Sequence, residues 1–321
     1  MTVAPRLYPL HETDAAALAA EAEAGLRRAA ARIAPKFFYD TLGSRLFDAI
    51  TELPSYYPTR TEREIFDRFG PEIAAAAIAH TGPAPVLIDL GAGNCAKAAR
   101  LFGLLAPRRY VAVDISADYL RDALVALQRE HPAIEMVGVG QDFSARLELP
   151  FELRAGRALV FYPGSSIGNF ERGAALRLLR DARAASAGGA LLIGVDLVKA
   201  KPLLDAAYDD QLGVTAAFNL NLLVHLNRLL DTNFDPRDWR HVAFFDERAS
   251  RVEMHLEARK ALTVAWPSGE RRFAAGERIH TEDSYKWTPE GFAALLREAG
   301  CRDIAHWCDA RGWFAVYVAR G

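Results

Sequence analysis

A short glycine-rich segment holds the residue types best suited to cradle a ligand. Gly91 and Gly93 come shortly after residues 86–88, an apolar and mostly β-branched run that is typical of a buried parallel strand. Glycine lacks a Cβ, so its backbone can turn sharply and approach a ligand closely. Residues 95–105 then have a helix-forming composition. The segment therefore predicts a strand, a cradling loop and a helix.

An aspartate supports that prediction. Asp114 ends a second strand-like segment, residues 110–114, about twenty residues after the glycines, and its carboxylate can accept hydrogen bonds from a ribose diol. Together these residues favour a nucleoside-type cofactor. The third glycine of the G-x-G-x-x-G dinucleotide fingerprint is missing, and the alternative is an ordinary tight turn with an incidental aspartate.

Two later segments place further polar residues after strand-like runs. Asp142 and Phe143 follow residues 134–140, where a carboxylate and a ring can bond an adenine amino group and cover its face, although Phe143 would equally suit the core. Residues 163–170 supply glycines, serines and Asn169 after another buried run. Parallel strands end at one edge of their sheet, so we expect the cofactor and its neighbour to bind there.

Residues 35–60 are dense in aromatic side chains, including Tyr39, Phe47 and Tyr56. Such density can form core, because aromatic side chains bury large apolar areas. Prolines before and within residues 56–60 predict a shaped turn that carries two phenols and a guanidinium, and such turns often bind ligands. Core and binding site both remain open for this segment.

Other chemistries are disfavoured. The eight histidines never stand at H-x-x-x-H or H-E-x-x-H spacing, so no metal site is predicted. No G-x-x-x-x-G-K-[ST] loop is present, which disfavours a phosphate-transfer enzyme. The three cysteines form no C-x-x-C pair, which argues against a disulfide framework and fits a reducing cytoplasm.

The elements that must position these residues alternate strand and helix as far as Asp196, which predicts a parallel sheet covered on both faces. The alternation then breaks. We expect helix over residues 13–33, 61–82, 201–233 and 288–299, antiparallel strands within 242–255 and 262–273, and a terminal hairpin of 304–308 and 313–319.

Composition sets further bounds. The 321 residues are 51% hydrophobic and 25% charged, which is ordinary for a globular chain with room for two lobes. A net charge of -2 provides no positive electrostatic field that would attract nucleic acid or an anionic membrane, so neither is an expected partner. No run of membrane-spanning length and no signal-peptide core occur, so we expect a soluble, cytoplasmic protein.

Seven blocks, in order and over nearly the whole chain, resemble one family, the S-adenosylmethionine-dependent histidine Nα-methyltransferase of ergothioneine biosynthesis with its fungal relatives. The blocks are KFFYDTLGSRLFDAITELPSYYPTRTE, LIDLGAGNCAK, VAVDIS, PGSSIGNF, GVDLVK, AYDDQLGVTAAFNLNLL and RVEMHL. Many methyltransferases share the glycine loop, whereas FYD...LP-x-YYPTR and AYDD-x-x-GVTAAFN are specific to this group.

The resemblance implies an α/β fold: a Rossmann-like class I methyltransferase parallel sheet with an inserted, smaller α+β substrate-binding domain. Residues 61–198 and 287–321 would bind S-adenosyl-L-methionine, and residues 1–60 and 199–286 the amino-acid substrate. The implied reaction is trimethylation of the α-amino group of L-histidine to hercynine, the first step of ergothioneine biosynthesis, by a monomer. The closest alternative is an Nα-methyltransferase of the same family that acts on another aromatic amino acid or amine.

The resemblance also assigns site residues. Tyr39 and Phe47 would line the catalytic region around the amine and the methyl donor. The cofactor would contact Gly91, Gly93, Lys97, Asp114, Asp142 and Phe143. The α-carboxylate of the substrate would bind Asn169 and Tyr208, and its imidazole would bind Tyr56, Glu282 and Ser284, with Met254 near the ring.

The side-chain chemistry is compatible with these assignments. Neutral imidazole offers one N–H donor and one acceptor nitrogen, which the carboxylate of Glu282 and the hydroxyl of Ser284 can satisfy from one face of an extended segment. Without the resemblance, Glu282 and Asp283 would be interpreted as solvated loop charges and Met254 as packing. An NAD-type oxidoreductase and a non-catalytic nucleoside-binding module are the rivals from other classes.

Overall fold

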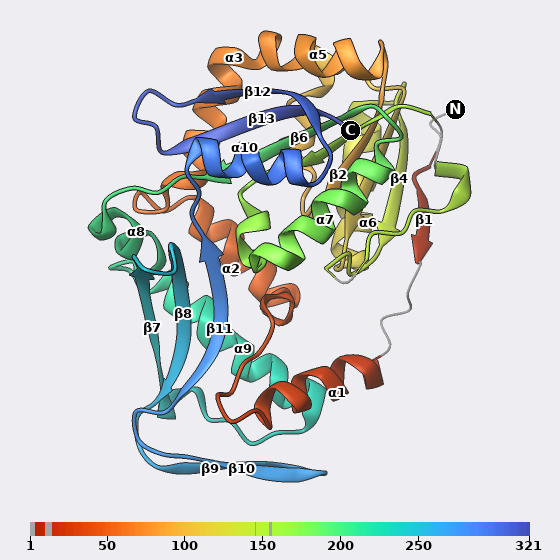
Figure 1. The fold of residues 1–321 in the computed structure, drawn as a ribbon. Coiled ribbons are helices and arrows are strands. Elements are labelled where there is room, and N and C mark those ends of the chain that lie inside the picture. The colour runs from red at the N-terminus through yellow and green to blue at the C-terminus, as the bar shows by residue number, and fades with distance from the viewer. Residues whose placement is uncertain (1–3, 10–14, 145, 154–155) are drawn as a thin grey trace. The chain divides into compact units, whose positions relative to one another are not determined.

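The computed structural model describes residues 4–9, 15–144, 146–153 and 156–321. The chain divides into two compact units (Figure 1). The first unit comprises Met1–Glu12, Pro58–Val198 and Lys286–Gly321, and the second unit comprises Thr13–Tyr57 and Lys199–Tyr285. No helix among these described residues has the length and apolarity needed to span a membrane.

An eight-stranded, mostly parallel sheet forms the centre of the first unit (Figure 1). Its strand order is β1-β4-β3-β2-β5-β6-β13-β12, in which only β13 and β12 run antiparallel to their neighbours. This sheet and its terminal hairpin confirm the predicted α/β class. The strands are β1 (Arg6–Pro9), β2 (Val86–Leu90), β3 (Arg109–Asp114), β4 (Glu135–Gly140), β5 (Ala158–Tyr162), β6 (Ala190–Asp196), β12 (Arg302–Cys308) and β13 (Phe314–Arg320).

Helices bury both faces of this sheet, which explains why its strands are nearly all apolar. Successive residues of β2 point to opposite faces of the sheet. Ile88 belongs to the apolar cluster on the face covered by α7 and α10, whereas Leu87 belongs to the cluster on the face covered by α3, α4, α5 and α6. The helices are α3 (Tyr57–Thr81), α4 (Ala96–Ala99), α5 (Phe102–Leu105), α6 (Ala117–Glu130), α7 (Arg172–Ala185) and α10 (Pro289–Glu298), with 3₁₀ turns η2 (Phe151–Leu153) and η3 (Ser166–Asn169).

The order of the parallel strands reverses at β2, which pairs with β3 on one side and β5 on the other. Ligands of open α/β sheets bind beyond the carboxyl ends of the strands at such a reversal, because the adjacent connections diverge to opposite faces. The loops after β2, β3, β4 and β5 are therefore the elements that the fold offers to a ligand.

The second unit is built on a three-stranded antiparallel sheet in the order β11-β8-β7. Helices α8 and α9 pack against this sheet, and α2 and α1 pack against α9. Its elements are α1 (Ala15–Leu26), η1 (Pro35–Phe38), α2 (Thr41–Thr51), α8 (Lys201–Tyr208), α9 (Val214–Leu230), η4 (Pro236–Asp238), β7 (Trp239–Asp246), β8 (Arg251–Ala258), the hairpin β9 (Leu262–Trp266) and β10 (Gly269–Phe273), and β11 (Arg278–Tyr285).

Four helix boundaries differ from the expectation. The predicted start at residue 13 lies outside the described residues, and α1 ends at Leu26 because Ala31 and Ile33 exchange backbone hydrogen bonds with His280 of β11. The expected helix 201–233 is two helices, because the carboxylate of Asp210 accepts from Val214 N and so starts α9.

The other two differences concern residues 95–105 and 56–60. Residues 95–105 form the short helices α4 and α5, because the chain tightens between them, where Leu101 N donates to the carbonyl of Ala98 three residues earlier. The turn expected at residues 56–60 is wrong from Tyr57 onward, because Tyr57 begins α3. Pro58 fits the first turn of that helix, where a missing N–H costs little.

Candidate active site

The glycine loop after β2 leaves open space beside its backbone. Gly91 has φ of +69° and Gly93 of +53°, a region that L side chains rarely adopt. The N–H groups of Gly91 and Ala92 both donate to the carbonyl of Val113, which fixes the loop against β3. A Cβ added to Gly93 would find no atom within 4 Å, so a ligand can approach this backbone closely.

Asp114 joins the loop to the end of β3. Its Oδ2 accepts from Gly93 N at 2.9 Å, and its Oδ1 accepts from Ser116 N at 2.9 Å. Burial raises the pKa of Asp114, and these backbone donors oppose that shift. A carboxylate oxygen can accept more than one hydrogen bond, so the geometry leaves acceptor capacity for a ribose diol.

Phe143 and Asp142 come from the loop after β4. A Cβ added to Gly91 would lie 3.9 Å from Phe143 Cζ, so the ring stands beside the glycine loop. The ring also packs edge-on against Tyr162, at 5.8 Å between centroids, and it contacts the apolar core. Asp142 Oδ1 accepts from Ser144 N at 2.9 Å. The chemistry of this set, a glycine cradle with carboxylates and a ring, fits a nucleoside.

Lys97 is paired with Glu62, a residue that the sequence analysis did not identify. Lys97 Nζ lies 2.8 Å from Oε2 of Glu62 on α3, and the other oxygen, Oε1, accepts from Gly164 N at 2.7 Å in the loop after β5. The side chain of Glu62 is only 3% exposed. One buried carboxylate therefore holds Lys97 and the Gly164 loop together. The only sign of this role in the sequence is that Glu62 is the last residue of the block that ends in PTRTE.

We expect Glu62→Gln to weaken cofactor binding about tenfold. The amide oxygen of glutamine can still accept from Gly164 N. Its NH₂ group, however, faces Lys97 and carries no negative charge to hold the ammonium. A hydrogen bond to a charged group is worth roughly 1.5–3 kcal/mol, so its loss accounts for the expected weakening. Titration calorimetry with S-adenosylmethionine measures the effect. Glu72→Gln, at an exposed position of the same helix, is the control; equal affinities of the two variants would contradict this role.

Asp89, just before the loop, gives the protein a predicted pH dependence. Burial raises its pKa to about 7, although Tyr110 donates a hydrogen bond to its Oδ2 at 2.7 Å. The unfolded value is about 4, so the protonated carboxyl contributes stability that is complete below that pH and lost as the pH rises through 7.

Asp89→Asn is therefore expected to flatten the pH profile of unfolding. Asparagine keeps the acceptor for Tyr110 and carries no charge, and roughly three pKa units correspond to ~4 kcal/mol. Urea unfolding at pH 5 and pH 8 should show wild type losing stability relative to the variant at pH 8. Asp122→Asn, exposed on α6, should follow wild type; a parallel profile for Asp89→Asn would refute the prediction.

The second unit gathers the predicted aromatic residues into one cluster. Ring centroids lie 5.8 Å apart for Tyr39 and Phe47, 6.3 Å for Phe47 and Tyr56, and 6.2 Å for Tyr56 and Tyr208, all edge to face. Phe218 of α9 packs against both Tyr39 and Phe47. The cluster is contiguous and carries three phenol groups.

β11 carries Glu282 and Ser284 of the predicted substrate set, and Ser284 contacts this cluster through Tyr208. Tyr208 Oη and Ser284 Oγ are 2.8 Å apart in a buried hydrogen bond. Glu282 is half-buried and pairs across the ladder with Met254, so the two share a face with Ser284, two residues along β11. Met254 is 2% exposed. The structure thus groups Tyr39, Phe47, Tyr56, Tyr208, Met254, Glu282 and Ser284 within the second unit, whereas Asn169 lies half-buried at the end of η3 in the first.

The side chains of His241 and Asn219 fix the position of Tyr208. His241 Nε2 donates to the Tyr208 carbonyl at 2.8 Å, and His241 Nδ1 accepts from Asn219 Nδ2 at 2.8 Å. Burial lowers the pKa of His241, which keeps the imidazole neutral as this bonding requires. Asn219 belongs to the GVTAAFN block, so part of that block positions the site rather than contacting a substrate.

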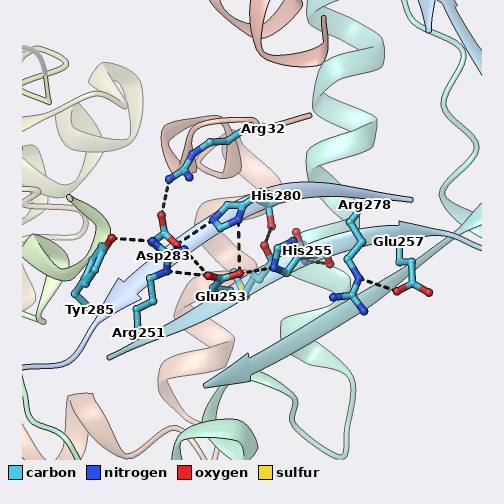
Figure 2. A network of polar contacts seen from close by, with 12 residues as sticks. Arg32, Arg251, Glu253, His255, Glu257, Arg278, His280, Asp283 and Tyr285 are labelled. Carbon is cyan, nitrogen blue, oxygen red and sulfur yellow. Dashed lines mark hydrogen bonds and ion pairs between the residues drawn. The ribbon is translucent and has the colours of Figure 1, made fainter. Parts of the chain in front are cut away.

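Asp283 lies between Glu282 and Ser284 and faces the other side of β11, because successive residues of a strand alternate sides. Figure 2 shows it beside Arg32, Arg251 and His280. Its carboxylate is wholly buried and lies 2.5 Å from an Arg32 nitrogen and 3.1 Å from Arg251 Nε. The interpretation of Glu282 and Asp283 as solvated loop charges is therefore wrong, since both residues lie on β11 and the buried carboxylate of Asp283 pairs with two arginines.

The parallel sheet, the glycine loop at its strand reversal and Asp114 at the next strand end define a class I, S-adenosylmethionine-dependent methyltransferase. Residues 18–321 match the family described as "Histidine-specific methyltransferase, SAM-dependent". The chain is 42% identical to the histidine N-alpha-methyltransferase of Mycolicibacterium smegmatis over 99% of both chains, and 40% identical to that of Mycobacterium tuberculosis over 94% of both. It is 27% identical to the 4-dimethylallyltryptophan N-methyltransferase easF of Claviceps purpurea, over 91% of this chain and 92% of that one. The chain belongs to the family of S-adenosylmethionine-dependent, histidine-specific methyltransferases.

Proposed function

We propose that this enzyme transfers three methyl groups in succession to the α-amino nitrogen of L-histidine, giving hercynine, the first product on the route to ergothioneine. The observation that carries the proposal is the shared face of β8 and β11, where Ser284 contacts Tyr208 of the aromatic cluster and Glu282 lies two residues along the same face. A carboxylate and a hydroxyl match the donor and acceptor nitrogens of a neutral imidazole. The 40–42% identity to relatives named for this activity supports it.

In this proposal the first unit holds the cofactor, whose sulfonium supplies an electrophilic methyl group when bound. Gly91 and Gly93 admit the nucleoside, Asp114 accepts from the ribose, and Asp142 with Phe143 bind the adenine. Lys97, held by Glu62, contributes a positive charge near the loop. The domain boundaries predicted from the sequence are part of the same proposal, except that Arg6–Pro9 form β1 of the first unit's sheet.

Residues of the second unit hold the amino acid. Glu282 and Ser284 fix the imidazole, with Tyr56 beside them, and Tyr208 binds the α-carboxylate together with Asn169. Orientation is the main contribution, since holding the reacting atoms in line can supply roughly 7–11 kcal/mol of the barrier. Tyr39 and Phe47 lower the local polarity, which favours the unprotonated amine that displacement requires. Their rings also suit the methylated ammonium product, because cations are attracted to aromatic faces.

A second candidate is methylation of another aromatic amino acid or amine, which the similarity to a dimethylallyltryptophan N-methyltransferase favours. Incubation with S-adenosylmethionine and an equimolar mixture of the standard amino acids separates the two. We expect mono-, di- and trimethylated histidine by mass spectrometry and no other methylated product; turnover of tryptophan or tyrosine in its place would favour the alternative. The monomeric state and the cytoplasmic location also remain proposals, which light scattering and cell fractionation test.

A further inference from the structure

The second unit carries a group of side chains that the proposed function does not use. Among the described residues, Glu253, His255 and His280 offer ligand atoms that all lie within 4.8 Å of one another. His255 on β8 pairs directly with His280 on β11, and Glu253 lies two residues along β8 on the same face. Figure 2 shows the three side chains converging between the two strands.

The carboxylate of Glu253 is oriented for the two rings. Arg251 binds its Oε1 through Nε at 2.8 Å and Nη2 at 2.5 Å. The other oxygen, Oε2, lies 2.9 Å from His255 Nε2 and 3.9 Å from His280 Nδ1. One carboxylate oxygen and two imidazole nitrogens therefore face a common point.

Neighbouring residues support this arrangement from outside. Asp283 Oδ1 lies 3.1 Å from His280 Nε2, the ring nitrogen away from Glu253. The two atoms make no hydrogen bond, so the carboxylate acts on the ring through its negative charge, which favours a cation bound there. The formal charges of Arg32, Arg251, Glu253 and Asp283 cancel, so an entering cation meets no net positive charge from these four groups.

The three side chains are mostly buried, but solvent can still reach them. The side chains of Glu253, His255 and His280 are 11%, 10% and 15% exposed. The His255 ring stacks on Phe244, with centroids 5.6 Å apart and planes within 5°, which restricts its rotation. The three donors are thus held in place before any ligand binds, and water can still reach them.

We propose that Glu253, His255 and His280 bind one Zn²⁺ ion. Two imidazoles and one carboxylate form a known donor set for zinc, and three protein ligands leave a fourth position for water. The ion would cross-link β8 to β11 on the face opposite Met254, Glu282 and Ser284, and so stabilise the strand pair that carries them. This binding does not depend on the proposed methyl transfer.

The test is titration calorimetry of the full chain, freed of metal with a chelator, against ZnCl₂ alone, without cofactor or amino acid. We expect one ion per chain and a Tm that rises with zinc concentration. The double variant His255→Gln/His280→Gln should lose more affinity than the roughly 10–100-fold that removal of an outer partner costs. His80→Gln, on α3 of the first unit, should bind as wild type does.

Absence of zinc binding to wild type, or equal binding by the double variant, would overturn the site. Circular dichroism checks that each variant folds, and the single variant His255→Gln replaces the double one if the latter does not. A methyl-transfer assay in the presence of the chelator separates the two proposals. Methyl transfer in the presence of the chelator, together with no zinc binding by wild type, would refute the metal site alone. Zinc binding without methylation of histidine would refute the proposed function alone.

Discussion

Replacing Glu282 by alanine is expected to raise KM for L-histidine on the order of 10- to 100-fold, while KM for S-adenosylmethionine hardly changes. Glu282 is half-buried on β11 opposite Met254, on the face that also carries Ser284. A hydrogen bond to a charged group is worth roughly 1.5–3 kcal/mol, and a partner left without it costs a similar amount. Initial-rate kinetics with each substrate varied in turn measure the split.

Glu270→Ala is the matched control for this substitution. Glu270 is an exposed glutamate on β10 of the same unit, and its removal should alter neither KM. Equal increases in both KM values for Glu282→Ala would assign Glu282 a general structural role. An unchanged KM for histidine would remove Glu282 from the substrate site.

The second large effect is expected at Asp114. Asp114→Ala removes the acceptor of Gly93 N and Ser116 N as well as the proposed ribose ligand, so the glycine loop loses its tie to β3. We expect the Kd for S-adenosylmethionine to rise on the order of 100-fold, because two charge-assisted hydrogen bonds and the ribose contact are lost together. Titration calorimetry with S-adenosylhomocysteine, which cannot react, gives the affinity directly.

Asp122→Ala, exposed on α6 eight residues further on, serves as the control and should bind as wild type does. Histidine affinity tests the specificity of the effect, since Asp114 belongs to the first unit. An Asp114→Ala chain that binds the cofactor normally would show that the nucleoside lies elsewhere.

Most of the first unit could be predicted from local sequence. Short apolar runs ending in glycine or aspartate indicate buried parallel strands, and the carboxyl ends of such strands meet at one edge. That rule alone placed Gly91, Asp114 and Phe143 near one another, and the structure confirms their proximity. The strand β1 escaped prediction because four residues carry too little periodicity.

The rest depends on contacts between distant residues. Glu62 is one carboxylate on a helix, and its partners Lys97 and Gly164 stand 35 and 102 residues away. No spacing rule connects such positions. The aromatic cluster of the second unit was assigned only through resemblance, since the aromatic residues of 35–60 suit a core equally well.

A backbone irregularity hid the histidine cluster. His280 and Asp283 are three residues apart and would lie on opposite faces of a regular strand. The register of β11 shifts between His280 and Glu282, and this bulge returns both side chains to the face of Glu253. Histidine spacing along the sequence therefore gave no sign of the cluster, because pairing of β8 with β11 creates it.

The central claim is methyl transfer to the α-nitrogen of histidine, and one measurement tests it most directly. The purified chain is incubated with L-histidine and S-adenosylmethionine carrying a ¹³C-labelled methyl group, and the product is analysed by NMR. The account predicts three equivalent labelled methyl groups on the α-nitrogen and an unmodified imidazole. Label on a ring nitrogen, or no label in histidine at all, would contradict it.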